Sequence, residues 1–429
     1  MMPKHVNSFS LNEEYFYVKH PSGLSIYVYP KRGYSSNYAI IGTNFGSINN
    51  KFREVGQESY VVVPDGIAHY LEHKLFASEQ GDAFELFAKT GASANAYTSF
   101  DKTAYLFSCT ENFEQSLNIL LDFVQSPYFT KENVEKERGI IGQEIKMYED
   151  DPEWSVLINL LNAMYHNHPV KNDIAGSIES ISTISPDLLY TCYDYFYNLN
   201  NMTLCVVGDF DVDKIFTIID KKLKYSKPVT VERYFLPEPN CIVKNFVSKK
   251  FDIKSSIFSL GFKDKSESIN KVTTEQMVYT DIIINILSSP SSDLYNELLK
   301  RNLINISTFS SEYFEGPGYS SIIFSGESSN CEKTADVIKN FINKIHKQGI
   351  KNEDFERAKR AVYGRSVSLF DKIKNIANVL LDFDFSGRNL FEYVQILQNA
   401  TIGKANARLS EQLICDNSAL SVAVPEKEE

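Results

Sequence analysis

The chain of 429 residues repeats its own pattern once, and this repeat constrains the fold more than any other feature of the sequence. Four blocks recur in the same order in both halves: a strand-like run, two helical blocks and a closing strand-like run. The offset stays near 218 residues (330 − 112). The pairs are 105–108 with 322–325, 112–124 with 330–342, 132–144 with 353–365, and 201–207 with 417–423. Chance similarity between amphipathic helices would not keep both order and offset, so the repeat predicts two domains of one fold in tandem.

The repeat also predicts how the chain is divided. We expect an N-terminal domain over 1–225, a linker over 226–247 and a homologous C-terminal domain over 248–429. Three prolines in the linker interrupt helical and strand periodicity. Within each half, strand-like and helical runs stand apart instead of alternating as βαβ units. The prediction is an α+β fold, in which each tandem domain is an antiparallel sheet with helices packed on one face.

Apolar residues three and four positions apart mark the expected helices. In the N-terminal half these are 66–77, 81–89, 112–124, 131–149, 153–165, 185–196 and 211–222. In the C-terminal half they are 272–287, 292–301, 330–347, 352–371 and 389–413. The helix 66–77 carries the chemistry that distinguishes the two halves.

Residues 69–73 read H-Y-L-E-H, an inverted form of the H-E-x-x-H zinc motif. On a helix, His69, Glu72 and His73 share one face because they are three and four positions apart. Two imidazoles one turn apart can bind one Zn²⁺, and a carboxylate beside them can take a proton from the metal-bound water. A solvent-facing amphipathic helix is the alternative. We disfavour it because all three residues stand in register in a chain with only seven histidines.

A catalytic zinc usually has three protein ligands, so the chain needs one beyond the two histidines. The acidic helical segment 131–149 supplies the candidates: Glu132, Glu135, Glu137, Glu144 and Glu149. Glu137 and Glu144 are seven positions apart and share a face. Gly139 and Gly142 lie between them and predict a close approach to another element, such as the zinc helix.

The second copy of the repeat lacks these groups. Ala358 stands at the position of Glu137 and Arg365 at that of Glu144, and the matching helix near 286–300 has no histidine. We therefore expect the C-terminal domain to keep the scaffold without the metal chemistry and to form the other wall of a chamber.

Three segments together resemble one family. Residues 69–73 (H-Y-L-E-H), 95–99 (N-A-Y-T-S) and 137–144 (E-R-G-I-I-G-Q-E) are similar to motifs of the pitrilysin, or insulinase-type, zinc metallopeptidases. The resemblance covers the whole chain in outline and is strongest over 60–210. It points to the short, two-domain bacterial members, which are similar to the mitochondrial processing peptidase, and it implies their two-domain fold.

The resemblance implies a role for each matching residue of the zinc site. In the family, two histidines and a distal glutamate bind zinc, which implies His69, His73 and Glu144 as ligands of Zn²⁺. The glutamate inside the inverted motif activates water, which implies Glu72 as the catalytic base. The upstream glutamate of the third segment supports the ligands, which implies Glu137 as a second catalytic acid.

The same resemblance assigns substrate binding to one strand. Asn95, Ala96 and Tyr97 would lie on an edge strand that pairs with an extended peptide. The substrate implied is therefore a peptide in an unstructured state.

One departure from the family pattern concerns the C-terminal domain. Active members carry there an Arg and a Tyr that hold the substrate carbonyl, and this sequence has Leu299 and Asn305 at those positions. Arg301 is two positions out of register and would face elsewhere on a helix. We therefore expect a heterodimer in which a zinc-free homologous subunit supplies the Arg/Tyr pair. A homodimer that is active by itself is the alternative.

Charge and composition argue against several other classes. The formal net charge is −11 without a long Lys/Arg run, which argues against binding to nucleic acid or to an anionic membrane surface. There is no run of 18 apolar residues that would predict a transmembrane helix, and residues 1–8 lack the apolar core of a signal peptide. Six scattered cysteines without a C-x-x-C pair are typical of reduced thiols, so we expect a cytoplasmic protein.

Three classes of function remain. The leading one is a zinc-dependent endopeptidase that cleaves unstructured peptides or leader segments as the zinc-bearing subunit of a heterodimer. The second is a non-cleaving peptide-binding or assembly subunit of the same family, against which Glu72 argues because a pure binder needs no general base. The third is a regulatory metal-binding protein, against which the strand 95–99 argues.

Overall fold

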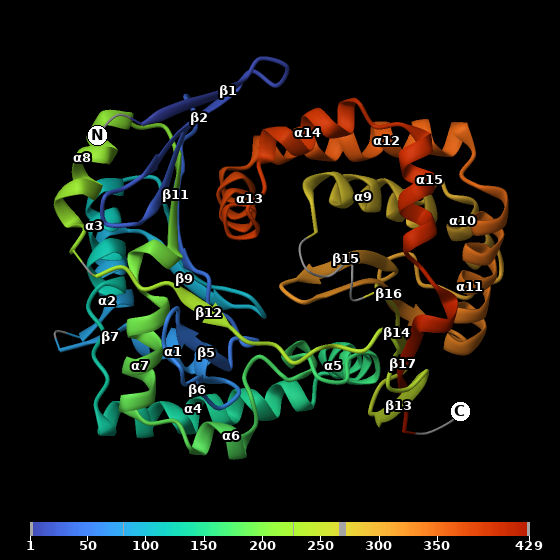
Figure 1. The fold of residues 1–429 in the computed structure, drawn as a ribbon, viewed down its shortest axis with the longest axis horizontal. Helices are drawn as coiled ribbons and strands as arrows, with labels where there is room; N and C mark the ends of the chain where they lie inside the picture. The colour runs from blue at the N-terminus through green and yellow to red at the C-terminus, as the bar shows by residue number, and fades with distance from the viewer. Residues whose placement is uncertain (1–2, 80, 226, 266–271, 427–429) are drawn as a thin grey trace. The chain divides into compact units, whose positions relative to one another are not determined.

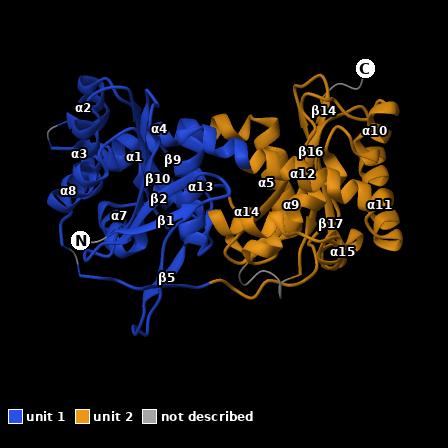
Figure 2. Cartoon of the chain, turned by 90° about the horizontal axis from the view of Figure 1, so that it is seen from above, with its two compact units in different colours: residues 1–145, 173–234, 367–390 blue, residues 146–172, 235–366, 391–429 orange. Residues whose placement is uncertain are grey.

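The computed structural model describes residues 3–79, 81–225, 227–265 and 272–426. These residues form two compact units, each assembled from three separate stretches of the sequence. Figure 2 shows unit 1, residues 1–145, 173–234 and 367–390, in blue and unit 2, residues 146–172, 235–366 and 391–429, in orange. None of the helices in the described stretches combines the length and the apolar character needed to cross a membrane.

Unit 1 is built on a seven-stranded sheet in the order β1-β2-β3-β11-β4-β10-β9 (Figure 1). Neighbouring strands are antiparallel except β3 and β11, which pair in parallel. β4 and β11 are buried along their whole length, and their runs of Ala, Val, Ile and Leu suit strands covered on both faces. The strands are β1 (Lys4–Ser8), β2 (Glu13–Lys19), β3 (Ser25–Pro30), β4 (Asn37–Thr43), β9 (Ser93–Thr98), β10 (Thr103–Cys109) and β11 (Met202–Gly208).

Unit 2 repeats five of these strands in the same order. Its sheet runs β13-β17-β14-β16-β15, which corresponds to β3-β11-β4-β10-β9 of unit 1. The strands are β13 (Phe246–Phe251), β14 (Ser256–Lys263), β15 (Ser310–Gly316), β16 (Tyr319–Ser328) and β17 (Ser418–Pro425). The predicted α+β class and tandem arrangement are thereby confirmed. Each of these two sheets contains one parallel pair, β3 with β11 in unit 1 and β13 with β17 in unit 2.

Helices cover both sheets. Many begin at a residue whose side chain accepts a backbone N–H, such as Asp82 before α2 and Asp211 before α8. Those of unit 1 are α1 (Ile67–Leu75), α2 (Ala83–Thr90), α3 (Phe113–Val124), most of α4 (Lys131–Glu149), α6 (Ile178–Ser182), α7 (Pro186–Phe196), α8 (Val212–Lys222) and α13 (Ile373–Ser386). Those of unit 2 are α5 (Pro152–Met164), α9 (Thr274–Ser288), α10 (Asp293–Lys300), α11 (Cys331–Gln348), α12 (Asn352–Ser368), α14 (Leu390–Gln398) and α15 (Ile402–Glu411).

One helix from each half of the sequence packs on the sheet of the other half. α13 lies on β4 and β11 of unit 1, on the opposite face from α3 and α8 (Figure 1), and α5 lies on β14 and β17 of unit 2. Glycines make room for both helices. A Cβ at Gly42 in β4 would lie 2.8 Å from Leu381 Cδ1, and one at Gly261 in β14 would lie 2.6 Å from Met164 Sδ. The two glycines are 219 positions apart (261 − 42), so the exchange follows the repeat.

The predicted linker over 226–247 contains a short strand, β12 (Val231–Arg233), and the first two residues of β13. β12 pairs with β5 (Lys51–Glu54), which also pairs with β6 (Val61–Val62). Arg53 and Glu232 form an ion pair across β5 and β12, with 2.9 Å between Nε and Oε2. The division between the compact units, at 234 and 235, falls inside this segment. The compact units are defined by packing, whereas the boundaries 1–225 and 248–429 describe the two copies of the repeat. Those boundaries stay a prediction.

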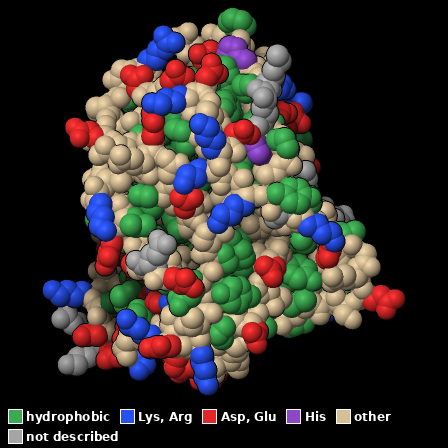
Figure 3. All heavy atoms as spheres, turned by 90° about the vertical axis from the view of Figure 1, so that its left-hand side faces the viewer, with side chains coloured by type: hydrophobic (Ala, Val, Ile, Leu, Met, Phe, Trp, Pro, Cys, Tyr) green, Lys and Arg blue, Asp and Glu red, His purple; other side chains and the backbone are tan. Residues whose placement is uncertain are grey.

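Charged side chains of both signs are interspersed on the face drawn in Figure 3, beside areas of hydrophobic side chains. The formal net charge of −11 is therefore not gathered into one acidic area on that face.

Candidate metal centre

The helix α1 carries polar side chains into the interior of unit 1. His69 and Glu72 are only 7% and 8% exposed, and His73 is partly buried. α1 begins after Gly66, whose φ of 89° is open to glycine but rarely to other residues. A Cβ at Gly66 would also collide with the backbone oxygen of Ala175. The start of the helix therefore packs directly against the loop before α6.

The helix α4 brings a carboxylate to the two histidines. Glu144 Oε1 lies 3.6 Å from His69 Nε2, and Glu144 Oε2 lies 3.4 Å from His73 Nε2. The two imidazole centroids are 4.6 Å apart. One possible ligand atom from each of the three residues lies within 4.8 Å of the other two. In the described part of the chain, this is the one group of three His, Cys, Asp or Glu side chains that converges so closely.

Glu137 contacts the other ring nitrogen of His73. Its Oε1 lies 3.2 Å from His73 Nδ1, and its Oε2 accepts a hydrogen bond from Lys74 Nζ at 3.1 Å. Lys74 is only 4% exposed, so this ion pair is largely shielded from water. A carboxylate at Nδ1 holds a proton there, so Nε2, which faces Glu144, is the His73 nitrogen that would lose its proton to bind a metal.

The surroundings shift the pKa values of these groups in different directions. Burial lowers the pKa of His69 to about 4, and the charge of His73 adds to the effect. Burial would also lower the pKa of His73, but hydrogen bonds to Glu137 and Glu144 outweigh it and raise that pKa to about 10. Burial would raise the pKa of Glu137, but hydrogen bonds from His73 and Lys74 bring it below its usual value. The metal-free site therefore holds one neutral and one protonated imidazole.

The three side chains fit Zn²⁺. Two imidazoles and a carboxylate are a known ligand set of catalytic zinc sites that keep the fourth position open. Ligand atoms about 2.1 Å from one tetrahedral ion lie about 3.4 Å from each other. At 3.6 Å, His69 and Glu144 are too far apart for a hydrogen bond, and His69 Nδ1 is buried without a described hydrogen-bond partner. The distances from Glu144 to the two histidines are close to those between neighbouring ligands of one ion.

The predicted substrate strand lies beside this group. Residues 95–97 belong to β9, the last strand of the seven-stranded sheet, and pair with β10 on one side. The hydroxyl of Tyr97 donates to Asn378 Oδ1 of α13 at 3.1 Å, so this side chain is engaged within unit 1. The hydroxyl of Thr98 donates to Glu72 Oε2 at 2.9 Å. The backbone edge of β9 is therefore what the strand offers to an extended peptide.

Three residues around the site were missed by sequence reasoning. Thr98 alternates with Tyr97 along the strand, so strand periodicity could have placed it on the opposite face. Lys74 is only one position from His73 and lies off its helical face, so helical periodicity does not single it out. Nothing local identifies Asn378, because it bonds to a residue 281 positions away.

The glycines of α4 do not mediate a close approach to α1, so that prediction is wrong. A Cβ at Gly139 would meet nothing within 4 Å, and one at Gly142 would meet Ile178 Cδ1 at 3.5 Å. Contact between the helices includes Tyr70 instead, whose hydroxyl donates to the carbonyl oxygen of Val134. A large side chain of α1, and not a glycine of α4, therefore lies at this contact.

At the two C-terminal positions where the family would carry Arg and Tyr, this chain has neither a positively charged side chain nor a phenol. Leu299 on α10 is 39% exposed, and Asn305 donates from Nδ2 to Glu327 Oε2 at 2.6 Å. Arg301 pairs with Glu297 at 2.6 Å, so its guanidinium is engaged on its own helix.

The repeat places α9 where unit 1 has α1, because α9 packs on β15 as α1 packs on β9. The sequence predicts this helix slightly further along the chain, near 286–300. Neither that segment nor α9 contains a histidine. Ala358 of α12 is fully buried, and Arg365 is exposed. Among its described residues, unit 2 thus has no counterpart of the metal-binding group.

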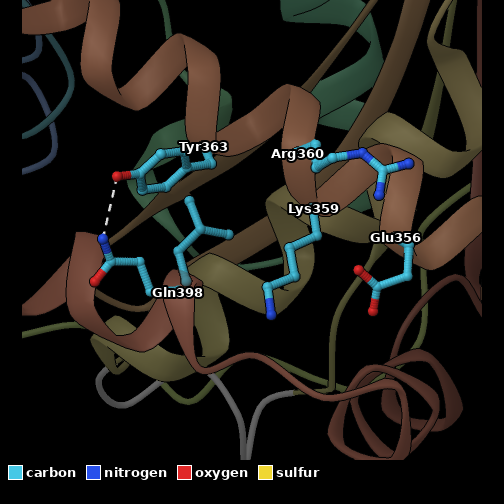
Figure 4. A pocket seen from close by; sticks show the side chains of 6 residues that line it. Glu356, Lys359, Arg360, Tyr363 and Gln398 are labelled. Carbon is cyan, nitrogen blue, oxygen red and sulfur yellow. Dashed lines mark hydrogen bonds between the residues drawn. The ribbon is translucent and has the colours of Figure 1, made fainter.

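A pocket of about 250 Å³ lies in unit 2, between α12 and α14 (Figure 4). Gln398 Nε2 donates to the hydroxyl of Tyr363 at 3.1 Å, and Lys359 Nζ donates to the carbonyl of Ala400 at 2.9 Å. Lys359 thereby anchors α12 to the loop before α15. The pocket holds no cluster of metal-binding side chains.

Comparison with known proteins agrees with this geometry. The family model described as insulinase (peptidase family M16) matches residues 63–177, and the one described as peptidase M16 inactive domain matches residues 183–362. A Bacillus subtilis (strain 168) protein named uncharacterized zinc protease YmfH is 36% identical over 428 residues, which is 99% of this chain and 100% of that protein.

Solved structures share the whole fold. The crystal structure of a protein from Alicyclobacillus acidocaldarius described as M16-like peptidase is 34% identical, with a TM-score of 0.92 over 96% of this chain and 99% of that one. Pitrilysin is 15% identical with a TM-score of 0.74, and the match covers 100% of this chain and 47% of the pitrilysin chain. The second comparison speaks for the fold alone.

Proposed function

Since this chain belongs to the insulinase family of M16 peptidases, we propose that it is a zinc-dependent endopeptidase that cleaves unstructured peptides or leader segments. The observation that carries the proposal is the convergence of His69, His73 and Glu144, with Glu72 on the same helix as the histidines. The relative in Bacillus subtilis is named a zinc protease, which supports the same class of reaction. The edge of β9 supports an extended peptide as the substrate, because an edge strand offers unpaired backbone groups.

In this proposal His69, His73 and Glu144 hold the metal. Bound Zn²⁺ would lower the pKa of a water molecule and polarise the scissile carbonyl. Glu72 accepts a proton from the attacking water and then passes it to the leaving amide nitrogen. Burial raises the pKa of Glu72. A raised pKa suits a carboxylate that must first accept a proton and then donate it near neutral pH. Glu137 keeps the proton of His73 on Nδ1, so that Nε2 stays free for the metal.

We further propose that a zinc-free homologous subunit completes the enzyme. Leu299 and Asn305 supply neither the positive charge nor the phenol that would hold a substrate carbonyl, and Arg301 is paired with Glu297. This chain spans about half the length of pitrilysin, which supports an assembly of two such chains. A homodimer is the alternative.

A cytoplasmic location is also proposed. All six cysteines are free thiols, which supports a reducing compartment. Cell fractionation with an antibody against the chain tests this, and recovery from an oxidising compartment would contradict it.

Cleavage of a quenched fluorescent peptide library by the purified, zinc-loaded chain, with a zinc-free homologue added if the chain alone is inert, tests the peptidase. The variant Glu72→Gln should keep its zinc and lose about 100- to 10,000-fold in kcat, because it removes the general base. Glu132→Gln makes the same chemical change on the exposed face of α4 and should leave turnover unchanged. Turnover that survives Glu72→Gln at the wild-type rate would refute the assigned mechanism.

The same assay tests the partner. If the zinc-loaded chain is inert alone, adding a zinc-free homologue with the Arg/Tyr pair should bring turnover. Full turnover by the chain alone would show that Leu299 and Asn305 do not leave the site incomplete.

A further inference from the structure

The proposed base, Glu72, is held by a side chain from the proposed substrate strand. The hydroxyl of Thr98 donates to Glu72 Oε2 at 2.9 Å. Among the described residues, this is the one hydrogen bond that the Glu72 carboxylate receives. Glu72 is 8% exposed, so little water is available to replace that donor.

The strand geometry explains why Thr98 can reach Glu72. Successive side chains of a strand point to opposite faces, so Thr98 and Tyr97 lie on opposite sides of the sheet. Tyr97 bonds to Asn378 of α13 on one side, and Thr98 bonds to α1 on the other. The last residue of β9 is thus anchored through its side chain to the base, while its neighbour is anchored to the helix that covers the sheet.

The hydroxyl proton of Thr98 has one strong acceptor. Thr103 Oγ1 lies 3.3 Å from Thr98 Oγ1 and donates its own proton to the carbonyl of Phe45 at 2.8 Å. The charged carboxylate of Glu72 is nearer than Thr103 and is the better acceptor for the Thr98 proton. A bond to Oε2 sets the plane of the carboxylate and leaves Oε1 without a donor from the described residues. Oε1 is therefore the oxygen left to accept a proton from an attacking water.

We propose that Thr98 is a positioning residue that orients the Glu72 carboxylate and ties this orientation to the strand that receives the substrate. The inference rests on the proposed function for its catalytic consequence. Pairing of a peptide with the edge of β9 would hold Thr98, and therefore Glu72, in the same arrangement. Through the Thr98 hydroxyl, binding of the substrate to β9 is linked to the orientation of the Glu72 carboxylate.

Kinetics of Thr98→Val and Thr98→Ser, measured with the zinc-free partner if the chain alone is inert, test the role. Valine keeps the shape and removes the hydroxyl, so kcat should fall about 10- to 100-fold while KM and zinc content stay near wild type. Serine restores the donor and should bring kcat to within about 3-fold of wild type. Thr217→Val is the matched control, because it removes a hydroxyl bonded to the Asp213 carbonyl on the exposed side of α8. A Thr98→Val kcat within 2-fold of wild type would overturn the proposal, and so would a serine variant as slow as the valine variant.

Crystal structures of the zinc-loaded chain and of its Thr98→Val form provide a readout that needs no activity. Wild type should show one orientation of the Glu72 carboxylate, with Oε2 on Thr98, and Thr98→Val should show a changed or divided orientation. An unchanged carboxylate in Thr98→Val would overturn the proposal even if turnover fell. A wild-type chain that binds zinc and cleaves nothing, even with a partner, would defeat the proposed function and leave this structural comparison decisive for Thr98.

Discussion

At the scale of single residues, the two histidines of α1 have opposite electrostatic surroundings although they are four positions apart. His73 has Glu137 at Nδ1 and Glu144 near Nε2, and its pKa is raised to about 10. His69 is more deeply buried, and its pKa is lowered to about 4. At neutral pH, the metal-free protein therefore carries a proton on His73 and none on His69.

Zinc uptake near pH 7 should release about one proton per chain, because His73 must lose its proton to become a ligand. The number released should fall as the pH approaches 10, the pKa of metal-free His73. Isothermal titration calorimetry in two buffers with different ionisation enthalpies measures it. Zinc binding at pH 7 without proton release would show that His73 is already neutral.

The same proton should stabilise the metal-free chain. A histidine with a raised pKa in the folded state contributes stability that is complete below its unfolded pKa of about 6.5 and is lost as the pH rises through the folded pKa. Thermal melting of the metal-free chain should therefore lose stability between pH 6.5 and 10. His73→Gln should reduce this slope. An identical slope in both proteins would assign the pH dependence to other groups.

Lys74→Met should weaken zinc binding about 10-fold at pH 7, as is typical when a group that supports a metal ligand is lost. Without the Lys74 hydrogen bond, the pKa of Glu137 rises, and the carboxylate holds His73 less firmly. Competition with a zinc chelator measures the affinity. Lys136→Met, on the exposed side of α4, is the control. Equal affinities in the two variants would mean that Lys74 matters only for packing.

Residues 69–73 show how much of the candidate site can be predicted from the sequence at the scale of single residues. Helical spacing predicts that His69, Glu72 and His73 share a face, and in the structure they lie on one buried helix. The same spacing left several glutamates of 131–149 open as ligands. The structure brings Glu144 to the histidines and Glu137 to His73 Nδ1. That distinction depends on the packing of α4 against α1, which no local pattern contains.

At the scale of elements, the two sheet glycines should differ in their tolerance of a methyl group. Gly42→Ala should destabilise the fold by about 1–3 kcal/mol, because its Cβ would press on the fully buried Leu381. Gly261→Ala should cost less, because the neighbouring thioether of Met164 can change its rotamer. Urea denaturation measures both. The opposite order would mean that α13 adapts more easily than α5.

Gly139→Ala is a control substitution that we expect to raise the stability of the fold instead of lowering it. A Cβ there meets nothing within 4 Å, and the residue lies inside α4. Alanine should therefore stabilise the protein by about 0.5–1 kcal/mol through helix propensity. A loss of stability in the same urea experiment would reveal a contact at this position.

The elements were predictable where the pattern is regular and local. The repeat predicted two related sheets, and their strand orders match over five strands. The segment predicted as one helix over 389–413 is two helices, α14 and α15. α13 was not predicted, because the face that it buries is partly polar: Asn378 bonds to Tyr97, and Asp384 accepts from Tyr27. Those partners lie in the other half of the sequence.

At the scale of the whole molecule, neither half of the sequence should form a stable unit alone. The predicted N-terminal domain, 1–225, contains the metal ligands but lacks α13, so the face of β4 and β11 would be open to water. Expressed alone it should aggregate or bind little zinc. Appending residues 367–390 through a flexible linker should restore a monomer with about one zinc per chain.

Size-exclusion chromatography and zinc analysis of the two proteins decide this prediction. Appending residues 331–348 in place of 367–390 is the control, because α11 packs on the sheet of unit 2. A fragment 1–225 that is monomeric and binds one zinc unaided would show that α13 is dispensable.

The exchange of α5 and α13 also sets the timing of synthesis. The ribosome has made every proposed metal ligand by residue 144, but it must continue past residue 386 before α13 can cover the sheet of unit 1. Throughout that interval the nascent chain carries the ligands on an unfinished scaffold. If the proposed peptidase needs α13 in place, a growing polypeptide should be inactive toward itself and its neighbours at the ribosome. On the proposed function, late completion of the fold would take the place of a removable inhibitory segment.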